Sequence, residues 1–182
     1  MKTSHLILKP ISRGFTLIEL IIVISIVSIL ATVLLTRLLD YQEQAEKVAM
    51  EQTAGIIRSA LQLQVAALIA SDHVGDIPKL VDENPMTWLA EKPHNYQGEY
   101  FDPVSGQIPP GSWYYDLKQK QLVYLVDRGR HFLADSGGRK AITYKVALAY
   151  NTERQPNQDS LGRRSVGGVV LQLARPYQWN KS

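Results

Sequence analysis

The first feature of the chain is a long apolar run near its N-terminus. Residues 15–39 read FTLIELIIVISIVSILATVLLTRLL, and the stretch from Leu20 to Thr36 contains no charged side chain. A helix of this length, rising about 1.5 Å per residue, spans roughly 37 Å, which exceeds the ~30 Å hydrocarbon core of a bilayer. The pattern therefore predicts that residues 15–39 form a membrane-spanning helix.

The helical pattern continues beyond this run. Residues 40–70 keep good helix formers and contain no proline, which predicts a helix to about Ala70. We expect one apolar stripe of it to face a core. The stripe repeats with a period near 3.6 and consists of Tyr41, Ala45, Val48, Ile56, Ala60, Leu63, Ala67 and Ala70. The charged side chains are expected on the opposite, solvated face, with Glu43 and Lys47 as an i,i+4 pair; they are Glu43, Glu46, Lys47, Glu51 and Arg58.

The remainder of the chain alternates between turn-rich and β-rich segments. Residues 71–107 are predicted to be a connector with one short helix over 85–90, capped by Asn84. Residues 151–165 are predicted to be an exposed loop. Strands are predicted at 112–117, 120–126, 141–150 and 166–174. The sequence thus predicts an α+β fold, in which a long N-terminal helix packs on an antiparallel sheet of about four strands.

The net positive charge of the chain comes from its N-terminus. Of 20 basic residues, three (Lys2, Lys9 and Arg13) lie in the first 14 residues, which hold no acidic residue, so the rest carries 17 basic and 17 acidic side chains. The positive-inside rule keeps this leader cytoplasmic and sends the C-terminal part outward. The expected organisation is a leader (1–14), a membrane half of the helix (15–39), an amphipathic half (40–70) and an extracytoplasmic head (71–182).

One carboxylate, Glu19, lies inside the apolar run, where a charge at the bilayer centre costs about 2.5–3.5 kcal/mol. In one interpretation Glu19 occupies the first helical turn at headgroup depth and favours the helix dipole. In the other, a cut between Gly14 and Phe15 creates an α-amino group with a pKa of about 7.7–8.0, four residues from Glu19 on the same helix face. Pairing of this amine with the carboxylate of a neighbouring chain would favour assembly.

These residues carry a family resemblance. Arg13-Gly14-Phe15-Thr16-Leu17-Ile18-Glu19, followed by a long apolar helix, resembles the N-terminal signal of type IV pilins and of type II secretion pseudopilins. The resemblance implies that a prepilin peptidase cleaves after Gly14 and N-methylates Phe15, and that Glu19 contacts the N-terminus of an adjacent subunit. It implies a pilin-like fold and an assembly role rather than an enzymatic one. The implied partners are other pilin or pseudopilin subunits, the prepilin peptidase, an inner-membrane assembly platform and membrane lipid.

Within the family we expect a minor pilin. The chain has no cysteine, unlike the disulfide-closed C-terminal region of many major pilins, and the hairpin WYYD…LVYLV is similar to the sheet entry of minor pilins of the mannose-sensitive haemagglutinin pilus. The alternative is a type II secretion pseudopilin. The expected location is the bacterial inner membrane with the head in the periplasm, followed by a surface pilus or a periplasmic pseudopilus.

The sequence does not favour a metal site or a nucleic-acid site. The four histidines are scattered singly, and Asp135 and Asp159 each supply one acid to glycine-containing loops that resemble a pseudopilin calcium site, whereas calcium needs six to eight oxygens. We therefore predict no metal and no cofactor. A further alternative is a filament-tip binding module for DNA or a surface, with Trp113 or Tyr114 stacking on a base. The neutral head favours reading the basic loop residues as solvated edges instead; these are Arg128, Arg130, Arg139, Lys140, Arg163 and Arg164.

Overall fold

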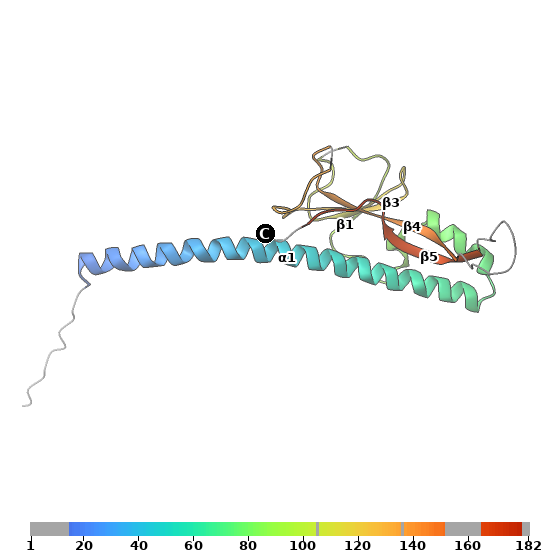
Figure 1. Cartoon of the computed structure of the whole chain (residues 1–182), viewed down its shortest axis with the longest axis horizontal. Coiled ribbons are helices and arrows are strands. Elements are labelled where there is room, and N and C mark those ends of the chain that lie inside the picture. Colours follow the sequence, from blue (N-terminus) through green and yellow to red (C-terminus); the bar gives the residue numbers. More distant parts are fainter. Residues whose placement is uncertain (1–14, 105, 136, 152–164, 180–182) are drawn as a thin grey trace, which may run out of the picture. The chain divides into compact units, whose positions relative to one another are not determined.

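The structure is a computed structural model that describes residues 15–104, 106–135, 137–151 and 165–179. These residues form one long helix, two 3-10 helices and five strands (Figure 1). In chain order they are α1 (Leu17–Ala70), η1 (Val74–Asp82), η2 (Pro85–Trp88), β1 (Tyr96–Tyr100), β2 (Trp113–Asp116), β3 (Gln121–Leu125), β4 (Ala141–Asn151) and β5 (Ser165–Leu173). The chain divides into two compact units, residues 1–41 and 42–182.

The ends of α1 follow from local chemistry. The Thr16 hydroxyl accepts the backbone N–H of Glu19 at 3.3 Å, the N-terminal half of a capping box. At the other end Asp72 adopts a left-handed conformation (φ 61°), and the N–H groups of Asp72 and His73 donate to the carbonyls of Ile69 and Leu68. This is a Schellman arrangement that ends the helix, and the predicted end at about Ala70 is confirmed.

The described part of the first unit, residues 15–41, is largely helical, and its side chains are almost all exposed. It is apolar and long enough to cross a membrane, and none of that apolar stretch is buried. Each hydroxyl between residues 25 and 36 donates to the carbonyl four residues earlier, at 2.7–3.0 Å; the donors are Ser25, Ser28, Thr32 and Thr36. Because these hydroxyl groups are satisfied within one helix, they need no further hydrogen-bond partner in lipid.

The second unit contains a five-stranded sheet in the order β1-β2-β3-β4-β5. β2 to β5 form the antiparallel meander that the sequence predicts, with strand ends within one residue of the prediction. β1 was not predicted and pairs parallel to β2, so the expectation of four antiparallel strands requires this correction. The pattern of β1 is interrupted by Gly98, which has φ 103° beside a register irregularity, and such a glycine hides a strand from periodicity.

The connector also contains more structure than expected. The predicted helix over 85–90 is the shorter 3-10 helix η2, and Asn84 is its cap, since the Asn84 side-chain carbonyl oxygen accepts the N–H of Met86 at 3.0 Å. The Asn84 amide donates to the Tyr96 hydroxyl and to Glu99, both at 2.7 Å. One buried side chain therefore both starts η2 and holds β1 in place.

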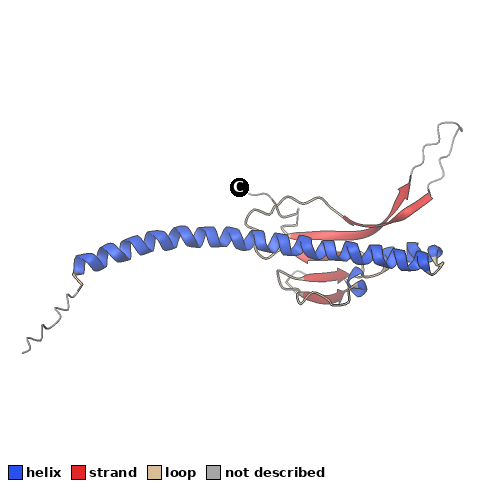
Figure 2. Ribbon diagram, turned by 90° about the horizontal axis from the view of Figure 1, so that it is seen from below, coloured by secondary structure: helices blue, strands red, loops and turns tan. Residues whose placement is uncertain are grey.

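The core lies between the sheet and one face of α1, whose C-terminal part runs alongside the strands (Figure 2). The buried helix residues are Glu43, Met50, Ala54, Ile57 and Leu61. They pack against the inward side chains of the strands, mainly Trp113, Tyr115, Leu122, Tyr124, Ile142, Tyr144, Val146, Val169 and Leu171. A small second cluster of Ile108, Tyr114 and Val123 covers part of the opposite face of the sheet.

The prediction of which apolar stripe of α1 is buried was wrong. Within the second unit Val48, Ile56 and Leu63 are 61%, 53% and 70% exposed, and in the first unit Tyr41 is 67% exposed. The residues that pack on the sheet belong to a different stripe, displaced by about two positions and with nearly the same period. Since both stripes are apolar, periodicity alone does not decide which one faces the sheet.

Candidate functional site

The N-terminal signal residues lie at the exposed start of α1. Gly14 is outside the described residues; Phe15 is 77% exposed, and Glu19 lies in the first turn of the helix. Its backbone N–H is bonded to Thr16, but among the described residues no side chain pairs with the Glu19 carboxylate. The site therefore presents an exposed aromatic residue and a carboxylate without a described side-chain partner on the surface of an apolar helix.

The apolar surface of this helix is large. All described residues from Phe15 to Leu39 are exposed, which includes seventeen large apolar side chains that touch no core. In the second unit the same helix carries Val48, Ile56 and Leu63 on its exposed face. An apolar surface of this extent requires lipid or protein to cover it.

The face of α1 toward the sheet carries two carboxylates. Glu43 is buried, and its Oε1 accepts the backbone N–H of His131 and the indole N–H of Trp179, both at 2.8 Å. Its Oε2 lies 2.8 Å from His131 Nδ1. Although burial by itself raises the pKa of Glu43, the hydrogen bonds from His131 and Trp179 lower it below the usual 4.5.

Glu46, one turn further along, holds the end of β3. Its Oε1 accepts the Tyr124 hydroxyl at 2.9 Å and the N–H of Asp127 at 2.8 Å, and its Oε2 accepts the N–H of Arg128 at 2.7 Å. Burial raises the pKa of Tyr124, and the negative charge of Glu46 raises it further, so the phenol stays protonated and donates a hydrogen bond. Together Glu43 and Glu46 fasten the β3–β4 loop and the C-terminal segment to α1.

These contacts correct the predicted solvated face. Glu43 and Glu46 face the sheet, and the Lys47 ammonium donates to the Trp179 carbonyl at 3.1 Å. The sequence analysis missed the contacts of Glu43 and Glu46 with the sheet, because their partners lie far along the chain and give no local signal. The available hint was that Glu43 lies seven residues before Met50 and fourteen before Ile57, in register with two buried apolar positions.

The structure describes four of the six predicted basic residues. Arg128 donates to the Gln42 side chain, and Lys140 donates to the Gly129 carbonyl at 2.7 Å, so both lie at the β3–β4 loop, to which Arg130 also belongs. Arg139 instead bonds the Tyr114 hydroxyl at 2.8 Å. Arg163 and Arg164 lie outside the described residues.

The rings proposed for base stacking are not available for it. Trp113 and Tyr114 are each 1% exposed, and they pack in the clusters on the two faces of the sheet. A stacking platform needs an open ring face, so this part of the nucleic-acid alternative was wrong.

The residues considered for calcium and histidine chemistry have structural surroundings. Asp135 Oδ1 accepts the N–H groups of Gly137 and Arg139, both at 2.9 Å, whereas Asp159 lies outside the described residues. His73 bonds the Ser71 carbonyl, and His131 contacts Glu43. In the described part of the chain no group of three His, Asp or Glu side chains is placed to hold a metal ion.

Comparisons with known proteins agree with the N-terminal features. The family described as the prokaryotic N-terminal methylation motif matches residues 10–35. The chain is also similar to the type IV narrow pilus major component PilA5 of Thermus thermophilus. The two are 35% identical over 82 residues, which cover 43% of this chain and 71% of the Thermus protein. No solved structure matches the chain.

Proposed function

Because the chain belongs to the type IV pilin family, a family of structural subunits and not of enzymes, we propose that it is a minor subunit of a type IV pilus. Residues 15–39 hold it in the inner membrane with the head in the periplasm, and α1 then packs into the filament. The observation that carries the proposal is the exposed apolar surface of α1 directly after the methylation motif. A surface suited to lipid is equally suited to neighbouring apolar helices, so the same segment serves before and after assembly.

Processing precedes assembly in this proposal. Prepilin peptidase cleaves between Gly14 and Phe15 and methylates the new N-terminus of Phe15. The methylated amine remains basic and meets the carboxylate of Glu19 on an adjacent subunit. The absence of a described side-chain partner for Glu19 supports this role, because an unpaired carboxylate in an apolar surface is stabilised when a neighbour supplies a cation.

The exposed stripe of α1 in the second unit extends the proposed packing surface. Val48, Ile56 and Leu63 lie away from the sheet while Met50 and Ile57 bury into it. A helix with apolar groups on both faces is suited to contact its own sheet on one side and another subunit on the other.

The minor role is supported by the cysteine-free head, although the Thermus relative is named as a major component. The proposal predicts that the protein is much rarer in purified pili than the most abundant subunit, as measured by quantitative mass spectrometry of sheared filaments. An equimolar or dominant share would contradict the minor role. Its recovery only in a periplasmic filament required for secretion would identify a type II pseudopilin instead.

The central experiment separates processing from assembly. Mass spectrometry of the mature protein is expected to show a methylated Phe15 N-terminus. Glu19→Gln should leave cleavage and methylation intact while sharply lowering incorporation into filaments. Glu91→Gln, at an exposed residue without a described contact, is the matched control and should assemble normally. An intact Met1 in the mature protein, or normal assembly of the Glu19→Gln variant, would refute the proposal.

A nucleic-acid role is not part of this function. The described basic side chains of the β3–β4 region are committed to intramolecular contacts, such as that of Lys140 with Gly129, and the candidate stacking rings are buried. The second candidate, capture of a surface, is favoured by a different observation, the pocket on the outer face of the sheet.

A further inference from the structure

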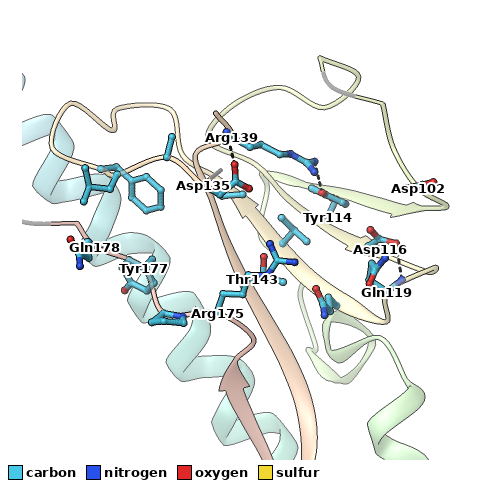
Figure 3. Close-up of a pocket in the computed structure, with 17 residues that line it drawn as sticks. Asp102, Tyr114, Asp116, Gln119, Asp135, Arg139, Thr143, Arg175, Tyr177 and Gln178 are labelled. Atoms are coloured by element: carbon cyan, nitrogen blue, oxygen red, sulfur yellow. Dashed lines mark hydrogen bonds between the residues drawn. The ribbon is translucent and has the colours of Figure 1, made fainter. Parts of the chain in front are cut away.

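The face of the sheet opposite α1 holds a pocket of about 510 Å³ (Figure 3). Its floor contains Tyr114, Val123 and Thr143, which are register partners across β2, β3 and β4. The neighbouring side chains Leu122, Ile142 and Tyr144 point the other way, into the core against α1. The pocket is therefore built on strands β2, β3 and β4, on the side of the sheet away from α1.

Two segments form walls of the pocket. One is the stretch Leu133–Asp135 of the β3–β4 loop, and the other is the C-terminal segment Arg175–Gln178. They are tied together, since the Leu133 N–H donates to the Gln178 carbonyl at 3.0 Å and Phe132 forms a bridge with Trp179. A pocket whose walls are hydrogen-bonded to each other keeps its shape without a ligand.

The carboxylates that line the pocket already have partners. Asp102 forms an ion pair with Lys118 at 2.5 Å. Asp116 Oδ1 accepts the N–H groups of Lys118 and Gln119 at 2.9 and 3.1 Å. Asp135 Oδ1 accepts two backbone N–H groups at 2.9 Å. These acids stabilise turns at the rim, so they do not define the pocket as a cation site.

The uncommitted polar groups include one cation and several neutral side chains. Arg175 is exposed and makes no hydrogen bond or ion pair with the residues that the structure describes. The side chains of Gln121, Thr143 and Gln178 likewise have no described hydrogen-bond partner. Figure 3 shows the Arg175 side chain extending from the C-terminal segment toward Thr143 on β4. The guanidinium thus extends toward a hydroxyl group that can both donate and accept a hydrogen bond.

We propose that this pocket binds an acidic saccharide unit, with its carboxylate on Arg175 and its ring hydroxyls on Gln121 and Thr143. A guanidinium pairs with a carboxylate through two parallel hydrogen bonds, and amide and hydroxyl side chains match the mixed donor and acceptor character of sugar hydroxyls. The volume lies in the range of small-ligand sites, about 300–1,000 Å³. A nucleic-acid backbone needs several uncommitted cations in a row, which the described lining of this pocket does not offer.

The inference deepens the surface-capture candidate and does not depend on filament assembly, because every lining residue belongs to the second unit. It is therefore tested on the full-length chain, unassembled, in a mild detergent. Failure of the Glu19 experiment would leave the result of this test unaffected, and the reverse also holds.

The test is calorimetric titration with trigalacturonate as the probe, a trimer in which every sugar carries a carboxylate. A neutral galactose trimer and inorganic phosphate are the comparison ligands. We expect saturable binding of trigalacturonate. The neutral trimer should bind more weakly than trigalacturonate, by about tenfold or more. Arg175→Gln and Thr143→Val should each weaken trigalacturonate binding, whereas Lys92→Gln, at an exposed cation outside the pocket, should not.

Three results would overturn the inference. The first is the absence of binding by trigalacturonate. The second is binding unaffected by Arg175→Gln. The third is phosphate binding that matches trigalacturonate and persists in Thr143→Val, because that outcome describes a simple anion site. Since Arg175 makes no described hydrogen bond or ion pair, its variant is expected to fold, and an unchanged thermal transition checks this.

Discussion

At the scale of single residues, the contact between α1 and the sheet depends on buried polar groups. The Glu43 carboxylate is removed from water but accepts three short hydrogen bonds from His131 and Trp179. A buried charge is tolerated when its lone pairs are satisfied in this way, and removing one partner leaves an expensive unpaired group. The stability of the docked loop therefore depends on the ionised form of Glu43.

This dependence predicts a pH effect. Because the pKa of Glu43 is lowered by folding, its contribution to stability is fully present above its unfolded value of about 4.5 and is lost as pH falls through the folded pKa. Glu43→Gln should lower the free energy of unfolding by about 2 kcal/mol at pH 7. The difference from the unsubstituted chain should shrink toward pH 3, as followed by urea unfolding with tryptophan fluorescence. A difference that stays constant from pH 7 to pH 3 would refute the assignment, and Glu91→Gln is the control.

Two tyrosines on the core side of the sheet give opposite predictions for the same substitution. The Tyr115 hydroxyl is buried without a described partner, and burial raises its pKa to about 12, whereas the Tyr124 hydroxyl donates to Glu46. Tyr115→Phe should leave stability unchanged or increase it by up to about 1 kcal/mol, because an unsatisfied group is removed. Tyr124→Phe should cost about 2 kcal/mol, because a bond to a charged acceptor is lost. Equal effects in denaturant titrations would contradict both assignments.

At the scale of elements, α1 is a helix with two apolar faces, and adjacent residues report on them. Ile57 is fully buried against the sheet, and Ile56 is 53% exposed. Ile57→Ala should destabilise the fold by about 2–5 kcal/mol through a lost contact and a cavity. Ile56→Ala should change stability by less than about 0.5 kcal/mol and instead reduce incorporation into filaments. The expected pattern is tested by unfolding of the detergent-solubilised chain and by quantifying each variant in sheared pili.

The outcome of this pair distinguishes the two stripes. If Ile56→Ala destabilised the chain as much as Ile57→Ala, the stripe on which Ile56 lies would belong to the core. If neither variant altered assembly, the exposed stripe would have no role in packing between subunits.

The same elements show what the sequence is able to predict. The length and end of α1 and the four strands β2 to β5 follow from local patterns, because apolar runs, alternation and turn residues act over a few positions. The buried face of α1 and the strand β1 do not, because each is decided by distant partners. Glu43 faces the sheet because His131 and Trp179 donate hydrogen bonds to its carboxylate. Strand β1 pairs with β2 despite Gly98, because the Asn84 side chain holds Tyr96 and Glu99.

The candidate functional residues likewise include some that the sequence predicts and some that it does not. The signal residues Gly14, Phe15 and Glu19 lie within six consecutive positions, so the sequence alone reveals their pattern. The pocket on the outer sheet face joins Thr143 to Arg175 and is formed by the register of strands and the path of the C-terminal segment. No local pattern marks such residues, since neither their spacing nor their type is unusual.

At the scale of the whole molecule, burial is confined to one of the two units. Every described residue that is buried lies in the range from Glu43 to Trp179, whereas the described residues from Phe15 to Leu39 are all exposed. A unit with its own core is expected to fold by itself. The membrane half of α1 is thus expected to contribute to location and assembly and little to the stability of the head.

We therefore expect the fragment 40–182 to be soluble without detergent and to unfold cooperatively. Its free energy of unfolding should lie within about 0.5 kcal/mol of that of the head in the detergent-solubilised full chain, because no core residue has been removed. A fragment that begins at Phe15 is the control and should need detergent, since its apolar helix surface has no cover. If the fragment 40–182 failed to unfold cooperatively while the full chain did so, residues 15–39 would have to support the head. The separation of anchoring from folding, on which the interpretation of Glu19 as a pure assembly residue depends, would then be wrong.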